Sequence, residues 1–129
     1  RKLIDVYEGG AEVSLEKAAV QVREATGAPL TDEQLAPAKK RAIIVRMLRN
    51  LEGIARSAED VPALLRYTEA VLALNPDAGE DRMLRAVLNY QLGRREAAIR
   101  DADWLLEHHP EGVDQRQVQE FRRILDRPQ

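Results

Sequence analysis

Two apolar stretches of this chain end at a proline, and the two prolines lie 34 residues apart. They are Pro76, which follows Asn75, and Pro110, which follows His109. The same shift of 34 residues pairs similar residues between the stretches: Ala63 with Ala97, Arg66 with Arg100, Glu69 with Asp103, Leu72 with Leu106 and Asp77 with Glu111. Such a period predicts a stack of helix–turn–helix units, each of which buries its apolar face against the next.

The residues before each proline show the spacing of a helix, which places the helices of the stack. The first helix is expected over residues 39–57, where six apolar residues would form one face: Ile44, Met47, Leu48, Leu51, Ile54 and Ala55. Asp60 is the expected N-cap of the next helix. Pro62 suits the first turn of that helix, because a proline there loses no hydrogen bond.

The second unit repeats this plan around Gly93, which permits a tight turn between two helices. Ala86 and Ala98 are small enough to let neighbouring helices approach closely. A last helix over residues 113–126 has one apolar and one polar face, which suits the end of a repeat array. We therefore predict a mainly α fold over residues 39–129, with two tetratricopeptide-like (TPR-like) units and a capping helix.

Residues 1–38 are expected to form a separate lead-in, the tail of an upstream domain. The segment Leu3 to Tyr7 alternates weakly and runs into Gly9-Gly10, which is a turn signal. A short hairpin or strand remnant is therefore predicted there. Residues 15–26 have helical spacing and predict an extra helix, which Gly27 would end.

Composition excludes several classes of protein. The net charge of −2 in 129 residues is too balanced to indicate a nucleic-acid binder. Without cysteine there is no disulfide, thiolate metal site or cysteine nucleophile. No apolar run is long enough to cross a bilayer and no signal peptide is visible, so a cytoplasmic protein is expected. Because the chain starts with Arg1-Lys2 and not with Met, we expect a fragment of a longer protein.

The expected helix at 39–57 is the most distinctive surface, because it carries six basic residues and one acidic residue. The first helix of a TPR unit lines the concave surface, so a basic strip there could receive an acidic segment or a C-terminal carboxylate. Arg46, Arg49 and Arg56 are therefore candidate partner-binding residues. The alternative is that these charges solvate one face of the helix and pair with acids on neighbouring helices.

A specific carboxylate clamp is not expected. TPR domains that grip a peptide carboxylate use a Lys and an Asn one turn apart on these helices. Counted from the two repeat prolines, the corresponding positions are Arg49/Gly53 and Met83/Val87, which do not match. Asn50, in the same helix, is a candidate for a structural hydrogen bond to a neighbouring loop.

Trp104 is the fourth candidate partner contact, although a tryptophan on such a helix is more often a packing residue. His108-His109 is expected at a helix C-terminus and not at a metal, because adjacent helical residues point about 100° apart. Asp101 and Asp103 diverge on their helix, so they do not form an acid pair. No residue set indicates catalysis, a metal site or a cofactor, so none of these is predicted.

Three stretches together resemble one bacterial family, the SirB-type transglutaminase-like proteins. They are Ile4-Asp5-Val6-Tyr7-Glu8-Gly9-Gly10, Leu35-Ala36-Pro37-Ala38 and Ile44-Val45-Arg46-Met47-Leu48-Arg49-Asn50-Leu51. The resemblance covers nearly the whole chain and implies the TPR-like tail of a protein with an upstream papain-like or transglutaminase-like domain. It also implies that any cysteine-type active site lies outside these residues, so no catalytic residue is carried over.

Two functions follow as hypotheses. The first is a non-enzymatic interaction or scaffolding module that recruits a protein partner, with no prediction of its oligomeric state. The second is an intramolecular accessory that packs on an upstream domain through an apolar patch around Leu3, Ile4 and Val6. Nucleic-acid binding through the basic helix is a third possibility, and the balanced net charge disfavours it.

Overall fold

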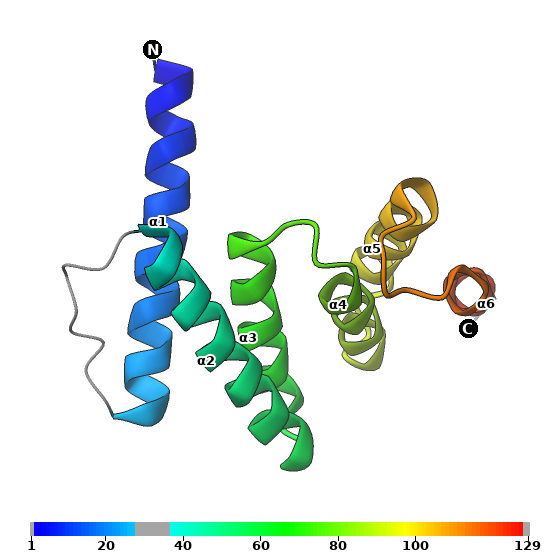
Figure 1. Cartoon of the computed structure of the whole chain (residues 1–129). Helices are drawn as coiled ribbons and strands as arrows, with labels where there is room; N and C mark the ends of the chain where they lie inside the picture. Colours follow the sequence, from blue (N-terminus) through cyan, green and yellow to red (C-terminus); the bar gives the residue numbers. More distant parts are fainter. Residues whose placement is uncertain (1, 28–36, 128–129) are drawn as a thin grey trace. The chain divides into compact units, whose positions relative to one another are not determined.

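The computed structural model describes residues 2–27 and 37–127, and all regular structure within them is helical (Figure 1). The helices there are α1 (Lys2–Thr26), α2 (Pro37–Ser57), α3 (Val61–Leu74), α4 (Gly79–Gln91), α5 (Arg95–His108) and α6 (Gln115–Leu125). This confirms the helical array that the 34-residue period predicts. Among the described residues, no helix combines the length and apolar character that crossing a membrane requires.

The chain divides into two compact units, residues 1–76 and residues 77–129. Each unit contains one helical hairpin of the repeat, and the division falls at the first repeat proline. The predicted boundary between residues 38 and 39 falls within the first turn of α2. That boundary, as a division between functional regions, stays a prediction.

The predicted hairpin or strand remnant near the amino terminus is wrong, because residues 2–26 form the single helix α1. A helix satisfies its backbone N–H and C=O groups within one segment, whereas a short strand needs a partner strand. Gly9 and Gly10 lie inside this helix, where each costs roughly 0.5–1 kcal/mol relative to alanine without ending it. The predicted helix end is confirmed: Gly27 has a φ of 71°, and its N–H donates to the Arg23 carbonyl at 2.8 Å.

The first unit is built on the hairpin of α2 and α3, and α1 packs on both helices. The turn ends at Asp60, whose carboxylate accepts the Ala63 N–H at 3.2 Å, so the predicted N-cap is confirmed. The buried aliphatic side chains come from all three helices: Ala18, Val22, Ile44, Leu48, Leu51, Ala55, Leu64, Leu65, Val71 and Leu72. This shared core is what fixes α2 in its orientation.

One member of the predicted apolar face of α2 lies on the wrong side. Ile54 is 65% exposed, whereas Glu52 is only 5% exposed. Helical spacing places these two residues on opposite sides of the buried line through Leu48 and Ala55. A side chain of α3 contacts Glu52, so α3 covers the Glu52 side and leaves Ile54 outside.

The second unit repeats the plan with α4 and α5, and α6 packs on α5. Gly93 in the connecting turn has a φ of 78°, a conformation that suits glycine. Ala86 and Ala98 are fully buried, as expected of close helix contacts. α6 buries Val118 and Leu125 in the core of this unit and keeps polar residues outside, as the predicted capping helix should.

The second repeat proline fixes the loop between α5 and α6 against the start of α4. A Cβ atom on Gly79 would lie only 2.6 Å from Cγ of Pro110, so a larger residue would push this loop away. Gly112 has a φ of 80°, and a Cβ atom on it would lie 2.8 Å from the carboxylate of Glu80. Two glycines thus allow the loop to approach α4 closely.

Candidate interaction surfaces

Five basic side chains of α2 are exposed, and Arg41 is the one that helical spacing places on the same side as the buried Leu48. The other four together are the α2 basic face: Lys39, Arg46, Arg49 and Arg56. Helical spacing puts Lys39 and Arg46 opposite the buried Leu48. Arg49 and Arg56 are seven residues apart, so they lie nearly in line along one side of the helix. The structure therefore gathers the three arginines predicted from the sequence on one exposed surface of α2.

The acid of α2 is removed from that surface. Glu52 is 5% exposed, and one of its carboxylate oxygens lies within hydrogen-bond distance, 3.0 Å, of the Thr68 hydroxyl of α3. The same hydroxyl lies 2.8 Å from the Leu64 carbonyl oxygen, so its one hydrogen is shared between the two acceptors. The other carboxylate oxygen of Glu52 lies 3.3 Å from Nη1 of Arg49. The exposed side of α2 consequently presents basic residues without an acidic one, which the residue count alone does not establish.

The arginines of the α2 basic face differ in their surroundings. Arg49 is engaged with the buried Glu52 and is 44% exposed at its side chain. Arg46 and Arg56 are exposed and form no ion pair with another residue in the described ranges. The hydrogen bond predicted for Asn50 is likewise not seen within these ranges, where the Asn50 side chain is exposed. Arg46 and Arg56 are therefore the arginines of this face that have no acidic partner within the described ranges.

Glu52 is a buried position that the periodicity argument missed. The shift of 34 residues places Glu52 on Ala86 and Thr68 on Ala102, both of which are fully buried. That correspondence is the signal that could have placed Glu52 inside the unit. Glutamate is rarely buried without a partner, so a glutamate at this position is read as a surface residue and the correspondence with a buried alanine is overlooked.

Trp104 belongs to the second unit, whereas the arginines of α2 belong to the first. Its ring is half-buried and stacks on His108 with a centroid distance of 4.0 Å, while the Arg82 guanidinium lies 3.9 Å from the ring centroid. Burial lowers the pKa of Arg82, and the nearby Asp101 acts in the opposite direction. These contacts support the packing role, and a partner contact at Trp104 stays a prediction.

Asp101 and Asp103 diverge, as predicted, and each joins α5 to a different helix. The buried Asp101 accepts two hydrogen bonds of 2.8 Å from Arg85 on α4. The exposed Asp103 pairs with Arg122 on α6 at 2.7 Å. The pKa of Arg122 is raised, first by the hydrogen bond to Asp103 and then by the one to Asp126. Both aspartates are explained by helix packing and not by acid–base chemistry.

The two histidines lie at the C-terminal end of α5, where they were expected. Nδ1 of His108 lies 2.9 Å from the Trp104 carbonyl oxygen, and His109 is the C-cap residue with a φ of 48°. Within the described part of the chain, no group of three His, Cys, Asp or Glu side chains could hold a metal ion.

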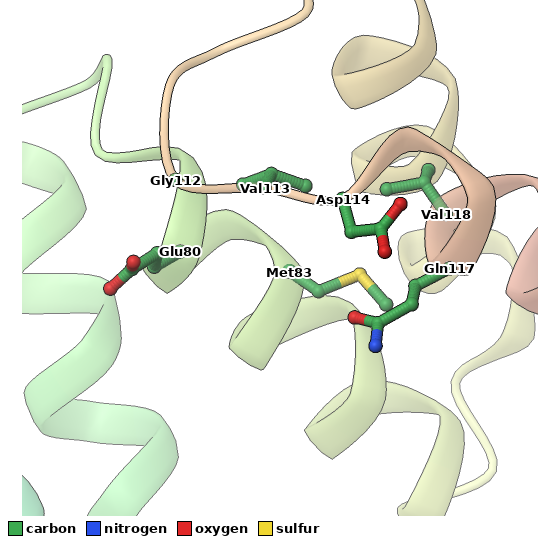
Figure 2. Close-up of a pocket in the computed structure, with 7 residues that line it drawn as sticks. All are labelled: Glu80, Met83, Gly112, Val113, Asp114, Gln117 and Val118. Carbon is green, nitrogen blue, oxygen red and sulfur yellow. The ribbon is translucent and has the colours of Figure 1, made fainter.

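A groove of about 140 Å³ lies between the start of α4, the α5–α6 loop and α6 (Figure 2). Its lining combines apolar and polar side chains: Glu80, Met83, Gly112, Val113, Asp114, Gln117 and Val118. Asp114 accepts the Arg116 N–H at 2.9 Å as the N-cap of α6. Glu80 lies in the first turn of α4, where negative charge is favourable. Helix ends thus account for both carboxylates, and the volume is below the range of about 300–1,000 Å³ that ligand pockets occupy.

The two hairpins and the capping helix define a protein of the helical-repeat class. In that class in general, stacked units present extended binding surfaces. Residues 51–123 match the tetratricopeptide repeat family, and the chain belongs to that family. The matched residues include both repeat prolines. The repeat inferred from a period of 34 residues is thereby confirmed.

Among curated proteins, the chain is similar to two UPF0162 proteins from Xylella fastidiosa. It is 28% identical to the protein of strain Temecula1 / ATCC 700964 and 29% identical to that of strain 9a5c, in each case over 113 residues. The alignments cover 84% of this chain, which spans about 40% of the length of these relatives. No solved structure matches the chain significantly.

Proposed function

We propose that this chain is a protein-interaction module of the TPR type, which binds an acidic segment of a partner protein through the α2 basic face. The TPR assignment supports a protein partner, because stacked helical units present extended surfaces for binding. The α2 basic face supports an acidic partner. In this proposal the chain itself is not catalytic, and it acts in the cytoplasm.

The burial of Glu52 is the observation that carries this proposal. A glutamate on the exposed side of α2 would neutralise part of the basic charge and offer the arginines an internal partner. Instead, Glu52 is directed to Thr68 of α3 and to Arg49, so Arg46 and Arg56 are left for an external acid. Guanidinium groups suit carboxylates, because they donate two parallel hydrogen bonds to one carboxylate.

The proposal is tested by reversing the two arginines that are not engaged with Glu52. The tagged chain and its Arg46→Glu/Arg56→Glu variant would be used to capture proteins from a lysate of the source cells. We expect the variant to lose the partner that the unmodified chain recovers, and recovery by the unmodified chain to fall as salt rises. Arg49 is left unchanged, because a glutamate there would face the buried Glu52.

A matched control separates this surface from net charge. The variant Arg23→Glu/Arg66→Glu changes the charge by the same amount at two exposed arginines of α1 and α3. It should recover the partner as the unmodified chain does. Equal recovery by the chain and by the α2 variant would exclude the α2 basic face as the binding surface.

A second candidate function is an intramolecular accessory of an upstream domain. The supporting observation is that the chain spans about 40% of the length of the UPF0162 relatives. The SirB-type resemblance points in the same direction and suggests a transglutaminase-like domain upstream. Hydrogen exchange at Leu3, Ile4 and Val6 tests it, because protection should increase in a longer protein that contains such a domain. Equal exchange in both proteins would exclude this packing.

A further inference from the structure

Gly53 leaves a notch, a position without a side chain, on the exposed side of α2 near its C-terminal end. A Cβ atom built on Gly53 would meet nothing within 4 Å, so the position is open to solvent. The residue also lies well inside the helix, four residues before its last residue, Ser57. A larger side chain would therefore fit there without a clash inside the unit.

Four other glycines, Gly27, Gly79, Gly93 and Gly112, have a structural reason, and Gly53 does not. Gly27, Gly93 and Gly112 have positive φ angles, and Gly79 lies against Pro110. Gly53 has helical geometry and no close neighbour. Glycine at an exposed helical position lowers stability relative to alanine, because it gains nothing there and loses more backbone entropy on folding.

The surroundings of the notch suit a carboxylate. On a helix surface, the neighbours of a residue are those three and four positions away. Around Gly53 these are Arg49, Asn50, Arg56 and Ser57, and all four side chains are exposed. They provide the Arg56 guanidinium, one amide and one hydroxyl around a position that has no side chain, while the Arg49 guanidinium is already paired with Glu52.

An apolar contact adjoins the notch. Ile54 follows Gly53 directly and is 65% exposed, which is the largest exposure among the exposed large hydrophobic residues of the described chain. A segment lying across Gly53 could thus cover an apolar group on one side and meet arginines on the other. Such a surface favours a ligand that carries both acidic and apolar residues.

We infer that the notch at Gly53 is the contact point for an acidic helical segment of a partner protein, whose backbone packs on Gly53. A carboxylate of that segment pairs with Arg56 and receives further hydrogen bonds from Asn50 and Ser57. An apolar side chain of the segment covers Ile54. This inference rests on the proposed function and specifies where on α2 the acidic partner binds.

The test uses a labelled peptide and the full chain. The probe is a fluorescein-labelled helical peptide of Glu, Ala and Leu, with a Gln-for-Glu peptide as its control. Fluorescence anisotropy would be measured with the unmodified chain and with Gly53→Ala and Gly53→Leu variants. We expect Gly53→Leu to weaken binding of the Glu peptide at least about tenfold, because its side chain fills the notch. Gly53→Ala should weaken binding by a smaller factor and raise the thermal midpoint of unfolding.

Opposite effects on stability and binding distinguish a contact role from a purely structural one. Ala73→Leu, at an exposed position of α3, adds a similar apolar surface elsewhere and should leave binding unchanged. If Gly53→Leu binds the Glu peptide as the unmodified chain does while Arg46→Glu/Arg56→Glu does not, Gly53 is not the contact point, and the proposal that the α2 basic face binds an acidic partner stands. If the Glu peptide binds no better than the Gln peptide, both proposals are refuted.

Discussion

The hydroxyl of Thr68 on α3 lies 3.0 Å from a carboxylate oxygen of Glu52 on α2, and both side chains are buried. The second unit has Ala86 and Ala102 at the corresponding positions, 34 residues later. Two repeat positions are thus filled by a buried polar pair in the first unit and by two methyl groups in the second. The polar pair also directs the acid of α2 away from its basic surface.

Removing the Thr68 hydroxyl should reveal the free-energy cost of burying the Glu52 carboxylate. We expect Thr68→Ala to lower the free energy of unfolding by roughly 1–3 kcal/mol, because a buried carboxylate loses a donor. The double variant Glu52→Ala/Thr68→Ala reproduces the residues of the second unit and should lose less than the sum of the two single variants. Urea unfolding of the four proteins measures this coupling. Strictly additive losses would mean that the two side chains do not interact.

The orientation of α2 predicts contrasting effects for two aliphatic residues. Leu48 is fully buried, so Leu48→Ala should lower the free energy of unfolding by roughly 2–5 kcal/mol. Ile54 is mostly exposed, so Ile54→Ala should change it by no more than about 0.5 kcal/mol. Chemical denaturation measures both. A loss at Ile54 comparable to that at Leu48 would place the opposite side of α2 in the core.

The ion pair between α4 and α5 should stabilise the second unit. Asp101→Asn removes the charge that accepts two hydrogen bonds from Arg85. We expect a loss of about 3 kcal/mol, at the lower end for a buried pair, because Arg85 is partly exposed and can turn to water. The exposed Asp103 provides the control, since Asp103→Asn should cost less than about 1 kcal/mol. Thermal unfolding of both variants measures these losses of stability. Equal losses for the two variants would contradict the assignment of Asp101 as buried and Asp103 as exposed.

Replacing either of two glycines by alanine should change the free energy of unfolding, with opposite signs at the two positions. Gly53 has helical geometry with open space around it, so Gly53→Ala should raise the free energy of unfolding by roughly 0.5–1 kcal/mol. Gly93 has a φ of 78°, so Gly93→Ala should lower it by more than about 1 kcal/mol through backbone strain. Denaturant titration of the pair checks both signs. Destabilisation by Gly53→Ala would show that the position is not open.

Local sequence signals determined most of the helical array. The prolines at 76 and 110 set the period, and Asp60 and Gly93 marked the ends of helices, because caps and positive φ angles depend on the residue itself. Small residues at 86 and 98 indicated close helix contacts. These features are encoded within a few residues, so they can be found without knowing the neighbouring helices.

The tertiary structure decided which way α2 faces and where its charges point. Apolar residues are spread around so much of this helix that several orientations would bury a comparable number of them, and sequence reasoning chose Ile54 over Glu52. Packing on α1 and α3 selected another orientation, in which Thr68 supplies the donor that a buried Glu52 needs. The prediction of a strand at residues 3–7 was wrong because a strand needs a partner strand elsewhere in the chain. The helix α1 forms its backbone hydrogen bonds within its own segment and needs no such partner.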